Sequence, residues 1–320
     1  MVKTISEILE FVKKTDNFLL TIHQNADGDA FASILAIASL LGEWQKSYKM
    51  IIHDSSIDSK YHFLTGIDKI QSYHPNFEMK FNAAIILDVP SRKRIGNPAN
   101  LLPSIDYCVK IDHHPVEEEF AKYNLVDVEA SSTSQLIYDI IEAGKIPLNK
   151  ELAEILFTGI MYDTGRFSFS NTRQRDFEIA TRLTGYDIKP HVIANHLFFT
   201  SSFESIKTLG YALDNMQVYL DGKASIIYLP KEVISKKNHA EIEELANYSV
   251  AIKGVEVGLF IREIEPSFFK VSLRSRGKAN VNTIAKIFGG GGHAHAAGMR
   301  YKGKFEVLKN KLVFEISKHL

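Results

Sequence analysis

Three short apolar runs in the first half of the chain each end in residues that can bind metal ions or transfer protons. NFLLTI is followed by a His and two Asp, AAIIL by one Asp, and YCVKI by Asp-His-His. These residues are His23, Asp27, Asp29, Asp88, Asp112, His113 and His114. Carboxylates can bridge two cations about 3.5–4 Å apart in sites that hydrolyse phosphoesters, and imidazole suits transition metals better than Mg²⁺. The residue types therefore indicate metal-assisted hydrolysis.

A further acidic position comes at the end of a helix-like pattern. Asp163 lies in the segment YDTG, directly after the helix expected over 150–161. An Asp at the end of a strand or before a helix is usually a turn or N-cap residue, so each position alone has an ordinary explanation. However, when several strand ends carry such residues, the combination favours a metal-binding site. Gly28 is expected to let the backbone fold so that the carboxylates of Asp27 and Asp29 diverge.

The elements that position these residues are predicted from the alternation of short apolar runs with helix-like segments. Strands are expected at 17–22, 49–53, 83–87 and 107–111, and helices at 31–44, 133–143 and 150–161. This alternation predicts an α/β domain with a parallel sheet and helices on both faces. Because ligands of such sheets bind beyond the carboxyl ends of the strands, the His and Asp residues should meet at one edge.

The pattern changes near residue 187. We expect a metal-binding domain over 1–187, a connector over 188–203, and a second, smaller α/β domain over 204–320. The second domain is predicted to hold strands at 224–229, 255–261 and 268–273, and helices at 203–219, 281–288 and 305–319. A chain of 320 residues agrees with two domains of ordinary size.

Composition narrows the class of protein. The 38 basic residues balance the 38 acidic ones, whereas binding to long duplex nucleic acid usually needs a basic surface. Cys108 is the single cysteine and is interpreted as a buried apolar residue, which suits a reducing cytoplasm. No run reaches the roughly 18 apolar residues that a membrane helix requires. We therefore expect a cytoplasmic protein that neither crosses a membrane nor binds long duplexes.

The motifs resemble those of a known family. HQNADGDA at 23–30, the strand-terminal Asp88, DHH at 112–114 and GIMYDTGRF at 159–167 are similar, in order and separation, to the four motifs of the DHH phosphoesterases. SLRSRG at 272–277 and GGGGHAHAAG at 289–298 resemble the DHH-associated domain that follows in many members. The resemblance covers almost the whole chain. Ala26 stands where a proline is common, and this difference removes no ligand.

The resemblance implies two divalent metal ions, most often Mn²⁺, with Mg²⁺ or Co²⁺ as alternatives. One metal would be held by His23, Asp27 and Asp88, and the other by Asp29, Asp88, His113 and Asp163, with Asp88 as the bridge. Asp112 would orient an imidazole without binding metal itself. His114 would contact the substrate phosphate and help to protonate the leaving group. Water activated between the metals would attack the phosphorus in line, without a covalent enzyme intermediate.

The second domain is expected to bind the end of the substrate remote from the metals. Its glycine run precedes a His, and the exposed N–H groups of such a run can form an anion-binding loop, although a glycine run alone is more often a hinge. With the resemblance, the substrate-binding residues are Arg274, Gly290, Gly291, Gly292 and His293. Roles for Arg94, Arg166, Arg276 and His295 stay open; Arg94 and Arg166 are equally well explained as solvated surface charges.

Within the family, a two-domain chain without further modules resembles the enzymes that hydrolyse short oligoribonucleotides (nanoRNA) and remove the 3′-phosphate of 3′-phosphoadenosine 5′-phosphate (pAp). We therefore expect an oligoribonuclease, acting as an exonuclease, and a pAp phosphatase. The alternative is a soluble cyclic-di-AMP or linear dinucleotide phosphodiesterase, which the motifs do not separate. A catalytically silent nucleotide sensor is disfavoured because no ligand position is lost. The polarity of digestion and the formation of a homodimer stay open.

Overall fold

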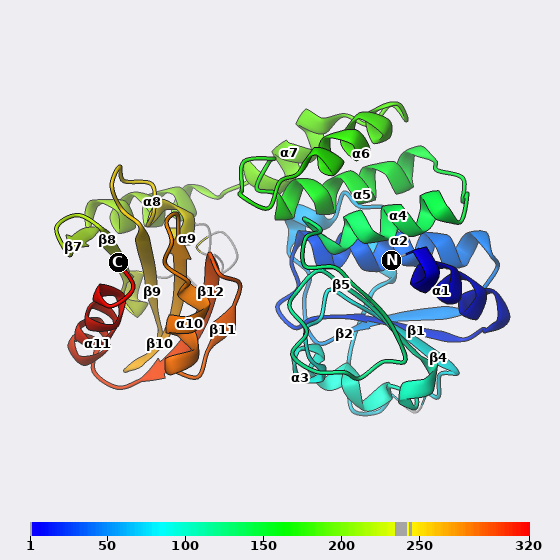
Figure 1. Cartoon of the computed structure of the whole chain (residues 1–320), viewed down its shortest axis with the longest axis horizontal. Helices are drawn as coiled ribbons and strands as arrows, with labels where there is room; N and C mark the ends of the chain where they lie inside the picture. The colour runs from blue at the N-terminus through cyan, green and yellow to red at the C-terminus, as the bar shows by residue number, and fades with distance from the viewer. Residues whose placement is uncertain (1, 78, 234–241, 243–244) are drawn as a thin grey trace. The chain divides into compact units, whose positions relative to one another are not determined.

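The chain forms two compact units, Met1–Thr200 and Ser201–Leu320 (Figure 1). The computed structural model describes residues 2–77, 79–233, 242 and 245–320. The predicted connector at 188–203 contains a helix, α7 (Pro190–Phe198), which belongs to the first unit. Each unit is built around its own six-stranded sheet.

The first unit alternates strands with helices along the chain. Its strands are β1 (Phe18–Ile22), β2 (Tyr48–Ile52), β3 (Gln71–Ser72), β4 (Ala83–Leu87), β5 (Cys108–Asp112) and β6 (Tyr123–Val126). Its α-helices are α1 (Val2–Lys14), α2 (Gly28–Glu43), α3 (Arg92–Ile95), α4 (Thr133–Ala143), α5 (Lys150–Asp163), α6 (Gln174–Thr184) and α7. Short 3-10 helices are η1 (Ser59–Tyr61), η2 (Ile67–Lys69), η3 (Asn97–Leu101) and η4 (Ile105–Tyr107).

The sheet of the first unit has the order β3-β2-β1-β4-β5-β6, and its described strand pairs are all parallel. The chain moves outward from β1 to β3 and then returns to the other side of β1 with β4. Strands β1 and β4 are therefore the pair at which the strand order reverses. Ile22 lies beside Leu87 in the register, so the residues that follow them leave the sheet side by side. Ligand sites of parallel α/β sheets lie at this kind of position.

Apolar layers cover the two faces of this sheet unequally. Phe18, Leu20 and Ile22 of β1 belong to a large buried cluster with α1, α2, α4 and α5, and Figure 1 shows these helices together on one side of the sheet. Leu19 points to the opposite side, into a smaller cluster with Ile95 of α3 and other residues. Helices therefore lie on both faces, as predicted, but the long ones cover a single face.

Polar side chains set where the helices nearest the sheet edge begin. Asp27 is the N-cap of α2 and accepts hydrogen bonds from the amides of Asp29 and Ala30, both at 3.2 Å. Ser132 caps α4 by accepting from the amide of Gln135 at 3.1 Å. Such caps satisfy amides that have no partner within the helix. They place the first turns of α2 and α4 beyond the strand ends.

The second unit has a mixed sheet of order β11-β12-β10-β9-β8-β7, in which β8 and β9 are parallel and the other described pairs are antiparallel. Its strands are β7 (Gln217–Tyr219), β8 (Ala224–Leu229), β9 (Val257–Glu265), β10 (Phe268–Ser275), β11 (Gly291–Gly292) and β12 (Ala296–Lys302). Its helices are α8 (Phe203–Asp214), η5 (Lys231–Val233), α9 (Leu245–Tyr248), α10 (Val281–Ile287) and α11 (Phe305–Ser317).

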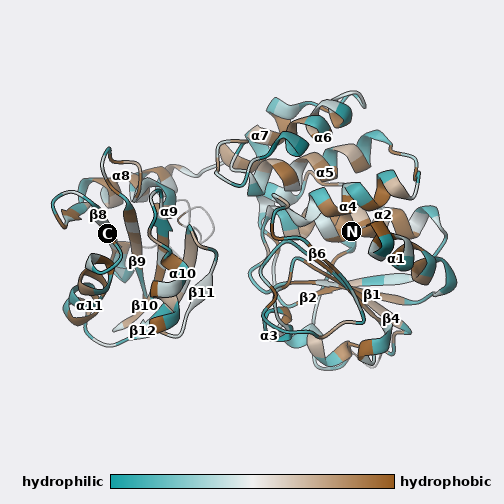
Figure 2. Cartoon of the chain, viewed as in Figure 1, coloured by the Kyte–Doolittle hydropathy of each residue, from teal (hydrophilic) through white to brown (hydrophobic). Residues whose placement is uncertain are grey.

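For the second unit, this structure corrects one prediction and adds a strand that was not predicted. The helix expected over 203–219 ends at Asp214, because Gln217–Tyr219 pairs with β8 instead. Residues 296–302 form the strand β12, which the sequence pattern did not reveal. Helix α11 buries Leu308, Leu312 and Ile316 against this sheet, and Figure 2 shows apolar and polar residues alternating along it.

Among the described residues, no helix is both long and apolar enough to cross a membrane.

Candidate metal centre

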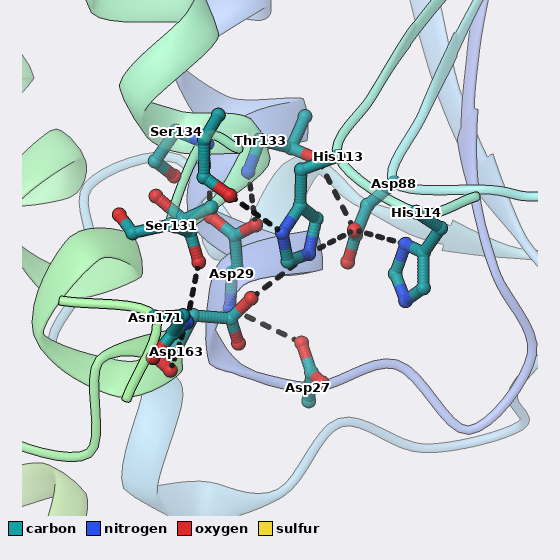
Figure 3. A network of polar contacts seen from close by, with 12 residues as sticks. Asp27, Asp29, Asp88, His113, His114, Ser131, Thr133, Ser134, Asp163 and Asn171 are labelled. Atoms are coloured by element: carbon teal, nitrogen blue, oxygen red, sulfur yellow. Dashed lines mark hydrogen bonds and ion pairs between the residues drawn. The ribbon is translucent and has the colours of Figure 1, made fainter. Parts of the chain in front are cut away.

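The predicted metal-binding residues of the first unit meet beyond the carboxyl ends of β1, β4 and β5 (Figure 3). His23 follows β1 directly, and Asp88 follows β4. Asp112 ends β5, with His113 and His114 next in the chain. Asp163 is the last residue of α5. The site therefore lies at the point where the strand order reverses.

The imidazole of His23 is oriented by the backbone. Its Nδ1 lies 3.0 Å from the carbonyl oxygen of Gln24, which can only accept a hydrogen bond, so Nδ1 carries the proton. Its Nε2 then faces Asp88 Oδ2 at 3.4 Å and Asp27 Oδ1 at 3.8 Å. This is the arrangement of a metal-binding histidine, in which one ring nitrogen donates to a fixed acceptor and the other is left to bind.

His113 has the same arrangement on the other side of Asp88. Its Nδ1 lies 3.4 Å from the carbonyl oxygen of Ala130. Its Nε2 lies 3.1 Å from Asp163 Oδ2 and 3.5 Å from Asp88 Oδ1. The two oxygens of Asp88 thus face different imidazoles, Oδ2 toward His23 and Oδ1 toward His113. That geometry suits a carboxylate that bridges two cations.

Asp29 is fully buried at the N-terminus of α4. Its Oδ2 accepts from the amide of Thr133 at 2.7 Å, and its Oδ1 accepts from the amide of Ser134 at 3.0 Å. The hydroxyl of Thr133 also donates to Asp88 Oδ1 at 3.1 Å. Sequence reasoning missed Thr133 and Ser134. The capping segment SSTS before the helix was the available signal, but nothing in it indicated which carboxylate it would hold.

Two backbone features keep these carboxylates close together. Asp88 has φ 61°, a left-handed conformation that is uncommon for residues other than glycine and that occurs often at functional sites. Gly159 of α5 lies so close to Asp29 that a Cβ there would be 2.7 Å from Asp29 Oδ1. Only glycine allows α5 to pack at this distance.

The explanation proposed for Gly28 is wrong. Its φ is not in the left-handed region, and it is simply the first residue of α2. A Cβ at this position would lie 2.5 Å from Cγ of Tyr162. Glycine is needed because the aromatic ring packs directly against the backbone, and the capping side chain of Asp27 sets the local fold.

The donor set fits divalent metal ions. Ligand atoms lie within 4.8 Å of one another in three groups: His23, Asp27 and Asp88; Asp29, His113 and Asp163; and Asp88, His113 and His114. Asp88 and His113 are each shared by two groups. Nitrogen and carboxylate donors in adjacent sets are what a two-metal site requires.

The charges of the site depend strongly on one another. Burial favours the neutral ring of His113, but Asp163, Asp88 and Asp29 outweigh it and raise the pKa of His113 to about 10. Burial and the neighbouring carboxylates Asp163 and Asp88 raise the pKa of Asp29 well above its usual range. Burial likewise raises the pKa of Asp163 to about 6, against the opposing effect of His113. Carboxylates crowded in this way are stabilised by cations.

His114 contacts Asp112 in addition to Asp88, whose Oδ1 lies 3.4 Å from His114 Nδ1. Its Nδ1 lies 2.8 Å from Asp112 Oδ1, and its amide donates to the same oxygen at 3.1 Å. Asp112 Oδ2 lies 3.2 Å from Nζ of Lys110, and both residues are fully buried. Asp112 thus orients the ring of His114, two residues further along the chain, and not the ring of His113, which directly follows it. Sequence reasoning missed Lys110, which looks like an ordinary residue of an apolar strand.

The predicted substrate-binding residues lie in the second unit. Arg274, in β10, donates from Nε to Asn247 Oδ1 at 3.1 Å. The amides of Gly289, Gly290 and His293 donate to backbone carbonyls at 3.0, 2.9 and 2.7 Å. The prediction that the glycine run exposes its N–H groups to an anion is therefore wrong for these three amides.

The glycine run has a packing role that its sequence did not reveal. Gly291 and Gly292 form β11 and pair with Gly298 and Ala297 of β12. A Cβ on Gly290 would lie 2.2 Å from the carbonyl oxygen of Gly298. The glycine run thus lets two backbone segments approach closely.

His295, whose role the sequence left open, has a structural partner: its Nδ1 lies 2.9 Å from the hydroxyl of Ser275.

The three arginines whose roles the sequence left open differ in their surroundings. Arg94 is exposed in α3, and its carbonyl oxygen accepts from the amide of Gln24 at 2.7 Å. Arg166 is exposed after α5, with its guanidinium carbon 4.8 Å from the ring centroid of Phe198. The amide of Arg276 donates to the carbonyl oxygen of Glu256 at 2.9 Å.

Comparison with known proteins agrees with the motifs. The DHH family, N-terminal domain, matches residues 17–160, and the DHHA1 domain matches residues 226–316. The chain is 29% identical over 298 residues to the bifunctional oligoribonuclease and PAP phosphatase NrnA of Bacillus subtilis, covering 92% of each chain. It is 27% identical over 303 residues to the protein of that name from Thermus thermophilus, covering 94% of this chain and 88% of the other. An exopolyphosphatase-related protein from Bacteroides fragilis has a crystal structure with TM-score 0.88 and 29% identity, covering 98% of this chain and 94% of that one.

Proposed function

The chain belongs to the DHH/DHHA1 phosphoesterases, and from this premise we propose that it hydrolyses short oligoribonucleotides to mononucleotides and removes the 3′-phosphate of pAp. The observation that carries the proposal is the set of carboxylates and imidazoles gathered around Asp88 at the reversal of strand order. Relatives that match nearly the full chain carry both activities in their names, which supports this choice of substrates.

The donor geometry supports the metal ligands that we propose. His23, Asp27 and Asp88 would hold one cation, and Asp29, Asp88, His113 and Asp163 the other. Mn²⁺ suits this mixture of nitrogen and carboxylate donors, with Mg²⁺ or Co²⁺ as alternatives. Two cations bound there would lower the pKa of the attacking water and offset charge on the phosphoryl group.

The chain's own residues supply orientation and proton transfer. Asp112 accepts from His114 Nδ1, which fixes the ring so that Nε2 is the nitrogen left for substrate. His114 would then contact the reacting phosphate and protonate the leaving oxygen. Thr133 and the amides of α4 hold Asp88 and Asp29 in place, so these carboxylates need not reorganise during the reaction. In the second unit, Arg274, Gly290–Gly292 and His293 would contact substrate, with the amides of Gly290 and His293 taking no part because they already donate to backbone carbonyls.

The experiment that tests this function is a side-by-side hydrolysis assay in Mn²⁺. The substrates are RNA two-mers to twenty-mers, pAp and cyclic-di-AMP. We expect fast cleavage of two- to five-mers and of pAp, with little cleavage of cyclic-di-AMP. Fast opening of cyclic-di-AMP together with inert short RNA would refute the proposed substrates while leaving the metal site unaffected.

A further inference from the structure

A strip of aromatic rings and cations lies directly beside the metal centre. We call it the aromatic strip and define it by Lys60, Tyr162, Phe198 and Arg166. Tyr162 precedes Asp163 in the chain, and its ring packs on the backbone of Gly28 between the two acidic residues of that turn. The rings of Tyr162 and Phe198 are stacked, with centroids 6.3 Å apart and planes 14° apart. The strip therefore begins at the edge of the site.

Two cations lie over these rings. Nζ of Lys60 is 5.6 Å from the ring centroid of Tyr162, and the guanidinium carbon of Arg166 is 4.8 Å from that of Phe198. Lys60 is half-buried and Arg166 is exposed. Within the described part of the chain, neither forms an ion pair with an acidic side chain.

Three other arginines in the same unit form ion pairs with acidic side chains. Arg173 pairs with Glu129, Arg175 with Asp139 at 2.6 Å, and Arg182 with Glu142 at 3.2 Å. The cations of the aromatic strip are instead held on ring faces, which fixes their position without neutralising them.

Alternating cations and aromatic faces suit a single-stranded nucleic acid. Such strands are bound by grooves that combine basic residues for the phosphates with rings on which bases stack. We propose that the aromatic strip binds the phosphates of nucleotides that lie beyond the scissile bond. This inference rests on the proposed function and adds to it a subsite for RNA of three or more nucleotides. The single nucleotide of pAp has no further nucleotide to place there.

The test compares the double variant Lys60→Met/Arg166→Met with the unmodified chain on an RNA five-mer and on pAp. Methionine keeps most of each side chain's length and removes the charge. We expect the ratio of kcat/KM for the five-mer to that for pAp to fall about tenfold, mainly through KM. The slope of log KM against log salt for the five-mer should also fall by about 0.7 for each lost phosphate contact.

Lys13→Met is a matched control. Nζ of Lys13 lies 5.4 Å from the ring centroid of Trp44, so this variant also removes a lysine from a ring face. Trp44 is the C-cap of the 16-residue helix α2, whose first residue Gly28 contacts Tyr162. The two ends of that helix are about 24 Å apart. The control should keep the five-mer to pAp ratio and the salt slope of the unmodified chain.

An unchanged ratio in the double variant, or an equal loss on both substrates with an unchanged salt slope, would overturn the subsite. The single variants Lys60→Met and Arg166→Met give the same comparison if the double variant does not fold. Failure of the proposed function is seen separately, because the unmodified chain would then cleave neither the five-mer nor the two-mer.

Discussion

Replacing Gly159 by alanine tests whether the packing of α5 sets the position of Asp29. A Cβ at residue 159 would lie 2.0 Å from Ser134 Oγ and 2.7 Å from Asp29 Oδ1. Overpacking of a close-packed interior typically costs about 1–3 kcal/mol. The hydroxyl of Ser134 can rotate away, but Asp29 is held by two backbone amides of α4. Either Asp29 leaves those amides or α5 moves, and both outcomes displace a proposed metal ligand.

The assay combines urea unfolding of the metal-free protein with calorimetric titration by Mn²⁺. We expect Gly159→Ala to lower the free energy of unfolding by about 1–3 kcal/mol and to weaken Mn²⁺ binding. Gly42→Ala, at a helical glycine with nothing within 4 Å of the added Cβ, should instead stabilise by up to about 1 kcal/mol.

A double variant separates the contact of the added methyl group with the Ser134 hydroxyl from its contact with Asp29. Ser134→Ala/Gly159→Ala removes the contact with Ser134 Oγ at 2.0 Å and leaves the contacts with Asp29 Oδ1 and Ser134 Cβ, both at 2.7 Å. It should recover part of the stability but not the Mn²⁺ affinity. If Gly159→Ala matches the unmodified chain in both stability and affinity, the packing of α5 does not determine the site.

Other predictions concern the charges of the site. Lys110→Met removes one of two cationic partners of the buried Asp112, the other being His114. The free energy of unfolding should therefore fall by about 1–3 kcal/mol in urea titrations, and no fall would show that the pair is not needed. Neighbouring carboxylates raise the pKa of His113 to about 10, against the effect of burial, so Mn²⁺ must displace a proton from this ring below that pH. Mn²⁺ affinity should therefore rise about tenfold per pH unit between pH 7 and 9 for each imidazole proton displaced. An affinity that calorimetry finds independent of pH would contradict this. The raised pKa of His113 also stabilises the metal-free fold. This stabilisation is complete at pH values below about 6.5, the pKa of histidine in the unfolded chain. That stabilisation is lost as pH rises through about 10, so the thermal midpoint of the metal-free protein should fall between pH 7 and 10, and a rising midpoint would refute this assignment.

The strand ends of the first unit were predictable because its buried strands are continuous apolar runs. Ala83–Leu87 forms β4 as predicted, and Asp88 follows it. The order of the strands was not predictable, since runs of similar composition carry no label for their neighbours. The sequence therefore indicated that His and Asp residues converge, but not that β1 and β4 lie side by side.

Contacts between distant segments account for most of what the sequence left out. The amides that hold Asp29 come from residues more than one hundred positions away, in a segment that reads locally as a helix cap. Glycine has several uses, and the sequence does not say which applies: Gly28 accommodates the ring of Tyr162, and Gly290 accommodates a carbonyl oxygen of β12. Strand β12 (AAGMRYK) was missed because Ala and Gly do not indicate a strand.

The most direct test of the two-metal site is the metal content of the protein after equilibration with Mn²⁺, measured with turnover for the unmodified chain, Asp163→Asn and Asp88→Asn. Asp163 would contact one cation, whereas Asp88 lies between His23 and His113 and would contact both. The unmodified chain should hold two Mn²⁺ per chain, Asp163→Asn about one, and Asp88→Asn fewer than one, with no turnover. An Asp88→Asn protein that keeps two metal ions, or that still hydrolyses short RNA or pAp, would contradict the bridging role of Asp88.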